Sequence, residues 1–147
     1  MSDIVIRKMA QRDLEDVLTI EKDTFSDHWS YNSFKSDLYN EMARPLVATL
    51  DEKLIGYACI YIVAGEIQIG NIAVAPAHRR RGVARLLMKE ILLIAEDKDC
   101  RSIFLEVRES NMAAQTLYNS LGFKAVAKRD AYYQNPRENA IIMVKEY

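Results

Sequence analysis

Three observations predict a mixed α/β fold built on one sheet. Segments with strand and helix periodicity follow one another in the order β-α-α-β-β-β-α-β-α-β-β. Short turns predict antiparallel hairpins near both ends, whereas a helix between two apolar strands in the middle predicts a parallel pair. The 147 residues, half of them hydrophobic, fit a single domain with one core over residues 1–147.

The first half of the chain predicts four strands and two helices. We expect a strand at 4–9, a helix at 13–25, a shorter helix at 32–38, and strands at 46–50, 54–63 and 66–74. Asp13 precedes apolar residues at helical spacing, which is typical of a helix start, and the second helix follows Ser30. The turn at 51–53 predicts a hairpin, and Pro76 follows the last of these strands.

The second half predicts two helices and three strands. We expect a helix from 82 to 96, a buried strand at 102–107, a helix that ends at Gly122, and strands at 123–132 and 140–145. The first of these helices has Val83, Leu87 and Ile91 on one face. Ser110 or Asn111 can cap the second.

The composition excludes several classes of protein. A net charge of −1 disfavours nucleic-acid binding, which usually needs a marked basic excess. Charges occur throughout the first 16 residues, so we expect no signal peptide, no membrane association and a cytoplasmic location. Cys59 and Cys100 have no CxxC partner, and we interpret both as reduced residues that fill space in the core and have no catalytic role. With two histidines in the chain, we expect no metal site.

The basic stretch HRRRGVARLL at 78–87 has three interpretations: a nucleic-acid patch, a solvated helix start, or a phosphate site. The first N–H groups of a helix lack intrahelical partners and, with the helix dipole, attract anions. Gly82 allows close backbone approach, and Ala84 is nearly as small. The pattern Arg79-x-x-Gly82-x-Ala84 therefore suits a pyrophosphate, although by itself it fits a solvated helix start equally well.

The segments NIAVAPAHRRRGVARLLM and LEVRESNMAAQTLYNSLGFK resemble the GCN5-related N-acetyltransferase (GNAT) family. Its acetyl-coenzyme A loop has the pattern Q/R-x-x-G-x-G/A, and Arg79, Gly82 and Ala84 match its three fixed positions. Ala84 stands where glycine is commoner. The ending DAYYQNPRENAIIM, with EVRESN and the Trp29 region, is more narrowly similar to the RimI-type ribosomal-protein-alanine N-acetyltransferases.

The resemblance implies a fold in which two central parallel strands, here 68–74 and 102–107, splay apart to form a V-shaped opening. It implies that the pantetheine arm of acetyl-coenzyme A pairs with backbone near 72–74, and that backbone N–H groups of 81–84 bind the pyrophosphate. The expected cofactor-binding residues are Ile72, Ala73, Val74, Arg79, Arg80, Arg81, Gly82, Val83, Ala84, Asn111 and Tyr118.

Acetyl transfer to an amine requires that the ammonium lose a proton and that the leaving thiolate gain one. Glu106 lies in the apolar run at 103–107, where a carboxylate is costly to bury. From the residues alone, an exposed or Arg-paired strand-end glutamate is the simpler interpretation, and Tyr118 is equally explained as a core tyrosine. The resemblance implies that Glu106 is the general base, acting through water, and that Tyr118 protonates the thiolate.

The acceptor side is expected to involve Trp29, Glu106, Tyr132 and Tyr133. Trp29 lies between the first two helices and fits a core anchor as well as a substrate contact, whereas we interpret His28 as a surface residue. Tyr132 and Tyr133 are adjacent in a strand, so we expect one to pack and the other to face substrate. Acidic residues at 13–27 form either a solvated helix face or a surface for a basic tail.

The resemblance thus implies an acetyl-coenzyme A-dependent enzyme that acetylates the N-terminal alanine of a small-subunit ribosomal protein, by direct transfer in a ternary complex. We expect a monomer or weak dimer, a basic protein as partner, and no contact with nucleic acid. Two alternatives remain. One keeps the chemistry but uses another N-terminus, a lysine or a small amine, and the other is a non-catalytic module that binds RNA or a phosphate ligand.

Overall fold

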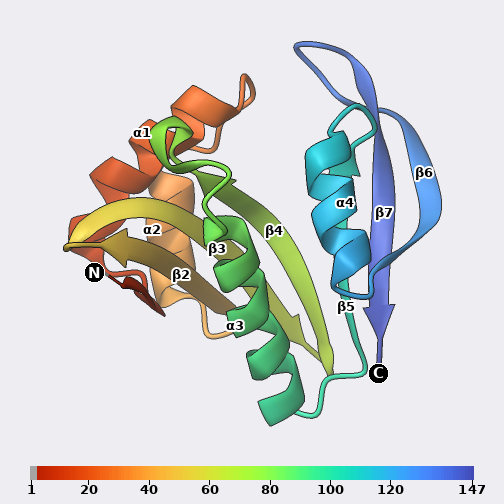
Figure 1. The fold of residues 1–147 in the computed structure, drawn as a ribbon, viewed down its shortest axis with the longest axis horizontal. Coiled ribbons are helices and arrows are strands. Elements are labelled where there is room, and N and C mark those ends of the chain that lie inside the picture. The colour runs from red at the N-terminus through yellow and green to blue at the C-terminus, as the bar shows by residue number, and fades with distance from the viewer. Residues whose placement is uncertain (1–2) are drawn as a thin grey trace.

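The computed structural model describes residues 3–147, and its centre is a seven-stranded mixed sheet (Figure 1). The strand order across the sheet is β1-β2-β3-β4-β5-β7-β6. The strands are β1 (Ile4–Lys8), β2 (Ala43–Leu50), β3 (Lys53–Val63), β4 (Glu66–Val74), β5 (Ser102–Arg108), β6 (Lys124–Tyr133) and β7 (Glu138–Glu146). All neighbouring pairs are antiparallel except β4 and β5, so the predicted mixed sheet is confirmed.

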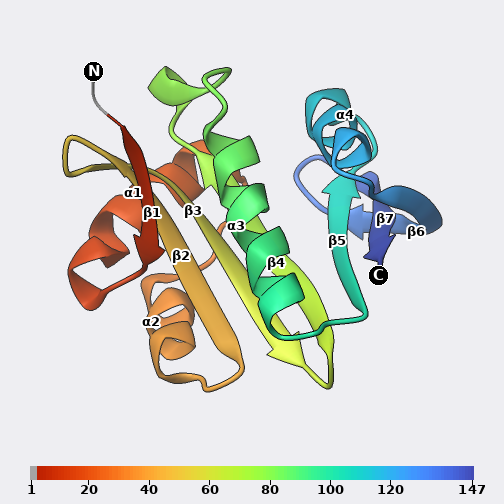
Figure 2. The same ribbon diagram turned by 60° about the horizontal axis from the view of Figure 1, so that its bottom comes forward.

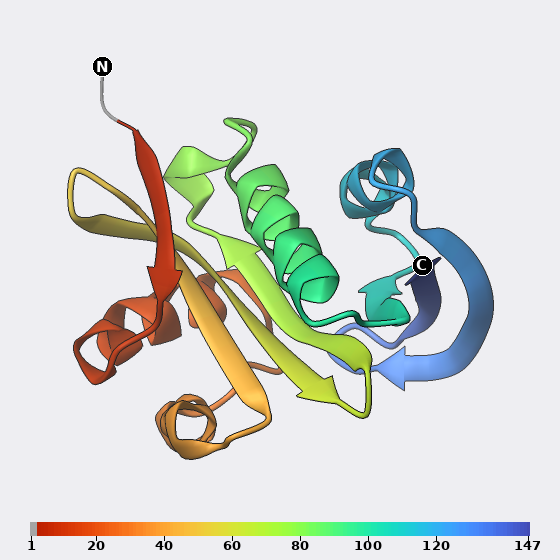
Figure 3. The same cartoon turned by 90° about the horizontal axis from the view of Figure 1, so that it is seen from below.

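Four α-helices cover the two faces of the sheet (Figure 3). These are α1 (Leu14–Thr24), α2 (Tyr31–Tyr39), α3 (Val83–Asp97) and α4 (Met112–Ser120). α1 and α2 pack on one face, around Phe34 and Tyr57, whereas α3 and α4 lie on the other, around Leu87 and Phe123. The molecule therefore has an α1/α2 face and an α3/α4 face. No helix within residues 3–147 is long and apolar enough to cross a membrane.

The parallel strands β4 and β5 separate halfway along their length (Figure 2). Their register runs from Glu66 opposite Ser102 to Ile69 opposite Leu105, and no pairing continues beyond. The last residues of β4 and of β5 thus have one unpaired backbone edge each, facing one another. A sheet edge inside a protein needs partners for its N–H and C=O groups. The Val74 carbonyl has one in Arg79 Nε, at 3.1 Å, and the remaining edge groups are open to a ligand.

A bulge in β4 coincides with the point of separation. Ile60 of β3 pairs with Ile69 and Cys59 pairs with Asn71, which leaves Gly70 as an extra residue. A Cβ at Gly70 would lie 2.8 Å from Cε2 of Tyr61, so only glycine fits without displacement. The extra residue reverses the side-chain alternation, because Ile69 packs in the α3/α4-face core whereas Ala73 packs in the α1/α2-face core.

The predicted order of elements is confirmed, with differences at the boundaries. β2 begins at Ala43, three residues before the predicted start, and it includes Pro45. The pairing between β1 and β2 stops at Leu46, so the missing N–H of Pro45 lies beyond the last ladder pair. Two single-turn 3-10 helices, Gln11–Asp13 and Pro76–His78, were not predicted; the second bridges β4 and the arginine run.

Asp13 connects the start of α1 to the edge strand. Its buried carboxylate accepts two hydrogen bonds from the Arg7 guanidinium, at 2.7 and 2.9 Å, and one from the Ala10 amide at 2.7 Å. The hydrogen bonds from Arg7, the larger effect, and from Ala10 lower the pKa of Asp13 despite its burial. Asp13 thus begins the helical segment as predicted, through a tertiary ion pair in addition to its local bond.

Candidate active site

A large cleft of about 1090 Å³ lies where β4 and β5 separate. Its walls come from both faces of the sheet: Val83, Ala84 and Leu117 from the α3/α4 face, and Phe25 and Trp29 from the α1/α2 face. The cleft therefore passes through the sheet at the V-shaped opening. Two molecules can approach each other from opposite faces and meet in the gap between the strands.

The arginine run forms a tight turn at the α3/α4-face end of the cleft. Arg80 and Gly82 both have positive φ, +65° and +79°, before α3 begins at Val83. A Cβ at Gly82 would meet nothing within 4 Å, so this glycine serves the left-handed conformation and leaves the helix start open. Such a turn leading into a helix N-terminus presents free N–H groups and suits an anion.

The three arginines have different environments. Arg79 bonds within the protein: its Nε donates to the Val74 carbonyl at 3.1 Å and its Nη2 to Thr24 Oγ1 at 3.2 Å. It thereby ties the turn to the end of β4 and to α1. Arg80 lines the cleft, whereas Arg81 is exposed and does not line it. Arg81 is the one expected site residue that the structure leaves outside the cleft wall.

α4 supplies the opposite wall on the α3/α4 face. Asn111, not Ser110, caps this helix, since its Oδ1 accepts from the Ala114 amide at 3.1 Å. Tyr118 packs against Phe123 with ring centroids 6.0 Å apart, and its side chain also lines the cleft. Burial raises the pKa of Tyr118 to about 12. Tyr118 is thus a core residue, as one interpretation has it. It also lines the cleft with its hydroxyl protonated at neutral pH, as a proton donor requires.

Glu106 lines the cleft from β5, on the side of the strand opposite the buried Leu105 and Val107. Its side chain is 19% exposed, and its Oε1 lies 3.8 Å from Arg129 Nη1. A hydrogen bond to Glu106 is the main cause of the raised pKa of the Tyr132 hydroxyl. The Arg-paired alternative for Glu106 is therefore observed, with the side chain partly buried and not exposed, and the residue also lines the cleft.

Tyr132 and Tyr133 both line the cleft, but Tyr132 is exposed whereas Tyr133 is half-buried, with the Arg108 guanidinium 4.4 Å from its ring centroid. The expectation that one packs and the other faces substrate stays a prediction. β6 has an irregular register between Arg129 and Tyr133, and Ala131 has a positive φ of +49°, which breaks the alternation. The rings meet edge to face at 5.1 Å. Burial, more than the Glu106 charge, raises the pKa of Tyr133 to about 12.

Trp29 combines the two roles that were weighed for it. Its ring packs on Phe34 with centroids 5.3 Å apart, and the residue also lines the cleft. A Cβ placed on Gly70 would lie 3.2 Å from Trp29 Cη2, so the indole edge lies over the bulge. His28 is exposed and outside the cleft wall, as expected for a surface residue.

Sequence reasoning missed Glu21, Tyr61 and Asn71, which line the cleft on the α1/α2 face. Glu21 is buried at 1% exposure, and it accepts hydrogen bonds from the Trp29 amide at 2.8 Å and Asn71 Nδ2 at 2.5 Å. Burial raises the pKa of Glu21. The available signal was its spacing: Leu14, Val17 and Glu21 share one helical stripe, which put a carboxylate where an apolar residue was expected.

Two loops meet beside the cleft on the α1/α2 face. Asn135, between β6 and β7, donates from Nδ2 to Asp27 Oδ1 at 2.9 Å, and its carbonyl accepts from the Ser26 hydroxyl. Arg108 supports the same loop by donating to the carbonyls of Gln134 and Pro136, at 3.1 and 3.0 Å. The two bonds of Asn135 join segments more than a hundred residues apart, and together with those of Arg108 they fix one border of the cleft.

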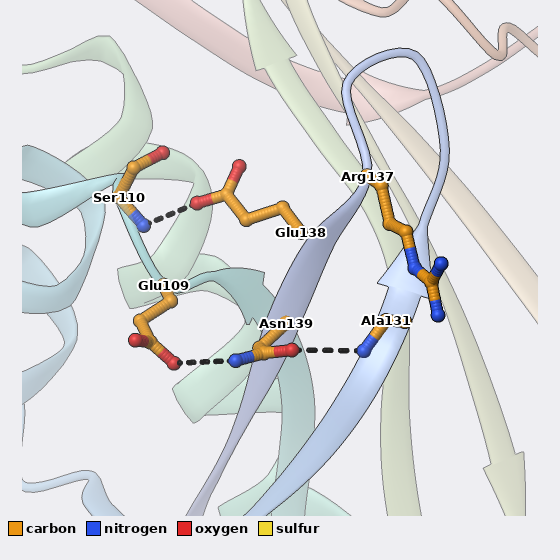
Figure 4. Close-up of a pocket in the computed structure, with 6 residues that line it drawn as sticks. All are labelled: Glu109, Ser110, Ala131, Arg137, Glu138 and Asn139. Carbon is orange, nitrogen blue, oxygen red and sulfur yellow. Dashed lines mark hydrogen bonds between the residues drawn. The ribbon is translucent and has the colours of Figure 1, made fainter.

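A second hollow of about 470 Å³ lies between the β5–α4 turn and the β6–β7 hairpin (Figure 4). Its polar groups bond one another: Glu138 accepts from the Ser110 amide at 2.5 Å, and Asn139 accepts from the Ala131 amide at 2.8 Å. Arg137 points away from these groups. A hollow whose polar groups are already partnered is a poor ligand site, so the cleft is the candidate active site.

The described residues contain no cluster of three or more histidine, cysteine, aspartate or glutamate side chains able to hold a metal ion. Cys59 and Cys100 are free thiols buried in the core, away from the cleft wall. The chemical groups that the cleft does offer include carboxylates, phenols, guanidinium groups, the His78 imidazole and a helix start.

Comparisons with known proteins agree with this geometry. The profile of the Acetyltransferase (GNAT) family matches residues 11–123. A Bacillus subtilis protein provisionally named as a ribosomal protein bS18-alanine N-acetyltransferase is 37% identical over 94% of this chain and 92% of its own length. The crystal structure of the ribosomal-protein-S18-alanine N-acetyltransferase from Escherichia coli superimposes with a TM-score of 0.91, at 33% identity, covering 98% of this chain and 94% of that one.

A more distant structure shares the fold alone. Arabidopsis thaliana NAA60, crystallised with acetyl-CoA, has a TM-score of 0.89 at 21% identity, with 98% of each chain covered. The family profile spans most of the chain, and the Bacillus subtilis relative matches over nearly its full length. The chain therefore belongs to the GNAT family and is an N-acetyltransferase.

Proposed function

We propose that this enzyme transfers the acetyl group of acetyl-coenzyme A to the α-amine of a protein N-terminus, with an alanine of a small-subunit ribosomal protein as the acceptor. One observation carries the proposal. The cleft passes through the sheet, with an anion-binding turn on one face and a carboxylate among aromatic side chains on the other. Such a passage lets a thioester and an amine meet from opposite sides.

The α3/α4 face fits acetyl-coenzyme A. In this proposal, backbone N–H groups from Arg81 to Ala84 bind the pyrophosphate, with Arg80 adding charge. The Arg81 side chain is not needed for this, because the amide does the binding. The unpaired edge of β4 at Ile72, Ala73 and Val74 offers partners to the amides of the pantetheine arm, as one strand pairs with another. Val83 and Asn111 complete the wall.

Glu106 and Tyr118 divide the proton transfers. Glu106 removes a proton from the acceptor ammonium, through a water, since an α-amino group has a pKa of about 8 and is mostly protonated at neutral pH. The free amine then attacks the thioester carbonyl, and the C–S bond breaks as the C–N bond forms. Tyr118 donates its phenolic proton to the leaving thiolate, and the second proton that the acylated nitrogen loses passes through water to the Tyr118 phenolate, which restores the phenol. Burial keeps the pKa of Tyr118 near 12, so the proton is available at neutral pH.

Direct transfer is favoured because both cysteines are buried outside the cleft wall, where neither can carry an acyl group between the two substrates. Acetyl-coenzyme A and acceptor then occupy the cleft together, in a ternary complex. The enzyme is proposed to act as a monomer or weak dimer.

The acceptor assignment rests on the names of the relatives and on the α1/α2 face. The Bacillus subtilis relative and the Escherichia coli structure carry names that specify the alanine of ribosomal protein bS18 or S18. On this chain, the exposed Asp23 and Asp27 line the cleft beside Trp29, and their charge suits a basic acceptor segment. A ribosomal acceptor would place the reaction in the cytoplasm, as the sequence predicts.

The test is coenzyme A release from acetyl-coenzyme A in the presence of short peptides with a free N-terminal alanine. The same peptides with a blocked N-terminus, a peptide whose only amine is a lysine side chain, and a polyamine are the controls. We expect release with the free alanine peptides alone. Turnover of the lysine peptide or the polyamine instead would assign a different acceptor to the same chemistry, and RNA binding that competes with coenzyme A would support the non-catalytic alternative.

A further inference from the structure

Glu21 is a buried carboxylate that the proposed proton transfers do not use. It is 1% exposed in the last turns of α1, on the stripe that faces the sheet. An ionisable group in an apolar environment is costly unless it is hydrogen-bonded. Within residues 3–147, Glu21 has no salt-bridge partner, so hydrogen bonds alone stabilise it there.

Three donors from three different elements converge on Glu21. The Trp29 amide donates to Oε2 at 2.8 Å, and Asn71 Nδ2 donates to Oε1 at 2.5 Å. The Tyr57 hydroxyl also donates to Oε1. The α1–α2 loop, β3 and β4 are thereby joined at one side chain. Replacing Glu21 alone would leave these three buried donors without their acceptor, so the positions of the three groups depend on this carboxylate.

Two of the three donors are themselves part of the cleft wall. Trp29 lies over the Gly70 bulge, and Asn71 is the first residue after it. The bulge turns the Asn71 side chain toward the α1/α2 face, where its Nδ2 donates a hydrogen bond to Glu21. Glu21 therefore controls where the indole and the carboxamide stand at the opening between β4 and β5.

We infer that Glu21 is a positioning residue for the acceptor side of the reaction. Its carboxylate fixes Trp29 and Asn71 as the wall against which the acceptor N-terminus lies, while its own oxygens stay occupied and do not touch the substrate. This inference rests on the proposed function, because it takes the α1/α2 face as the acceptor side. It predicts that the loss of Glu21 weakens the binding of the peptide far more than that of acetyl-coenzyme A.

Glu21→Gln is the sharpest variant, because it keeps the shape and removes one acceptor. A carboxamide has a single oxygen, and its NH2 group would face a donor, either the Trp29 amide or the Tyr57 and Asn71 pair. Asp13→Asn is the matched control. Asp13 is also a buried, hydrogen-bonded carboxylate, at the other end of the same helical segment and outside the cleft wall.

Steady-state kinetics gives the first readout. We expect Glu21→Gln to raise the KM of an alanine peptide about tenfold, the equivalent of one charged hydrogen bond, with the KM of acetyl-coenzyme A within about twofold of wild type. Asn71→Ala should also raise the KM of the peptide. The double variant should have a peptide KM no higher than that of Glu21→Gln, because both substitutions remove the same contact between Glu21 and Asn71. Asp13→Asn should leave both KM values unchanged.

The second readout needs no activity. Trp29 is the single tryptophan of the chain, so its fluorescence reports the α1–α2 loop directly. Glu21→Gln should increase iodide quenching and shift the emission to the red, whereas Asp13→Asn should do neither. If Glu21→Gln does not fold, Tyr57→Phe, which removes one of the three donors, should change peptide KM and quenching in the same directions but less.

The outcomes separate the two proposals. If wild type acetylates no peptide, the proposed acceptor is wrong, and the quenching of Trp29 still decides whether Glu21 holds the loop. Unchanged quenching and unchanged peptide KM in folded Glu21→Gln would overturn the inference. Equal increases in both KM values, or strictly additive effects of Glu21→Gln and Asn71→Ala, would also count against it, since they indicate a general loss of structure.

Discussion

Individual side chains in the cleft owe their roles to their surroundings more than to their types. Glu21 and Glu106 are both glutamates that line the cleft, but one has its oxygens occupied by three donors and the other is partly open to solvent beside Arg129. A carboxylate with free acceptor positions can take up a proton from a bound amine, whereas a fully bonded one stabilises its neighbours. The two residues therefore have different predicted consequences when neutralised.

Glu106→Gln should lower kcat by at least about a hundredfold, because general bases contribute about that much or more. The KM of acetyl-coenzyme A should stay near wild type, since Glu106 is on the α1/α2 side of β5. The measurement is steady-state kinetics at saturating peptide. Glu109→Gln is the control, because Glu109 pairs with Lys128 at 3.1 Å and lies outside the cleft wall. An unchanged kcat in Glu106→Gln would remove Glu106 from the mechanism.

Tyr118→Phe should lower kcat by about tenfold or more, since it deletes the proposed proton donor and keeps the ring that packs on Phe123. The raised pKa of about 12 means that the phenol is neutral at all lower pH values, so its own ionisation should cause no activity loss below about pH 10. Rates across pH 6–10 and thermal unfolding are the measurements. The exposed Tyr39→Phe is the control. Wild-type rates for Tyr118→Phe at every pH would exclude its acid role.

Sequence reasoning could identify the residues whose type is unusual in the predicted element, and the residues that match a known motif. Glu106 stood out inside an apolar strand, and Arg79, Gly82 and Ala84 matched a motif. Asn71 and Tyr61 could not be found in this way, because a polar residue near a strand end and a tyrosine in a strand are both ordinary. Their importance depends on contacts with α1 and α2, which no local pattern specifies.

At the scale of elements, the turn before α3 shows how backbone conformation prepares a site. Arg80 and Gly82 both adopt left-handed conformations, and the open space at Gly82 continues into the cleft. The backbone is therefore strained at Arg80, where a residue other than glycine has a positive φ, but not at Gly82, because glycine adopts a positive φ without strain. The helix start that results is exposed to the cleft from its first residue.

Gly82→Ala should cost about 1 kcal/mol of stability from the left-handed conformation, and it should raise the KM of acetyl-coenzyme A because the added methyl group enters the space at the helix start. Gly65→Ala is the matched control: it has the same φ of +79°, in the turn between β3 and β4, and lies outside the cleft wall. Chemical unfolding and acetyl-coenzyme A titration check both parts. Equal effects of the two variants on cofactor KM would contradict the assignment.

β6 marks the limit of element-scale prediction. Its existence and approximate range followed from the apolar pattern, but the irregular register near Ala131 did not, and this placed both Tyr132 and Tyr133 in the cleft. Bulges depend on cross-strand pairing, which two-residue alternation does not encode. For the same reason the sequence predicted β4 as a regular strand and missed the extra residue at Gly70.

At the scale of the whole molecule, stability and the cleft depend on different contacts between elements. The contact between Asn135 and the Ser26–Asp27 loop joins the last hairpin to the first helices beside the cleft, whereas the Arg7–Asp13 pair joins the edge strand to α1 away from it. The antiparallel hairpins and the parallel pair were predictable from the turns and the single crossover, whereas the position of β7 between β5 and β6 was not. The loop contacts were not, because they link residues over a hundred positions apart.

Asp13→Asn should lower the free energy of unfolding by about 1–2 kcal/mol at neutral pH, as it removes a charged hydrogen-bonded pair with a partly exposed arginine. The folded-state pKa of Asp13 lies below that of the unfolded chain. Its contribution is therefore complete above the unfolded value, about 3.9, and is lost as pH falls through the lower folded value. Urea unfolding at pH 7 and at stepwise lower pH should show the two proteins converging.

The exposed Asp16→Asn, on the same helix, is the control and should change stability little at either pH. A constant difference between wild type and Asp13→Asn down to the lowest pH that keeps the protein folded would show that the variant acts through something other than the carboxylate charge.

The Gly70 bulge makes the number of residues in β4, and not only their kinds, part of the information that specifies the active site. If Gly70 instead paired with Cys59 in a regular ladder, every later residue would move on by one position, and Asn71 and Ala73 would exchange faces with Ile72 and Val74. Every side chain beyond the opening would then face the wrong substrate, although each residue type was retained. Mutational scans that only substitute residues would not detect this dependence. Deletion of Ile72, which would move Ala73 and Val74 to opposite faces, should abolish activity even where the sheet still forms.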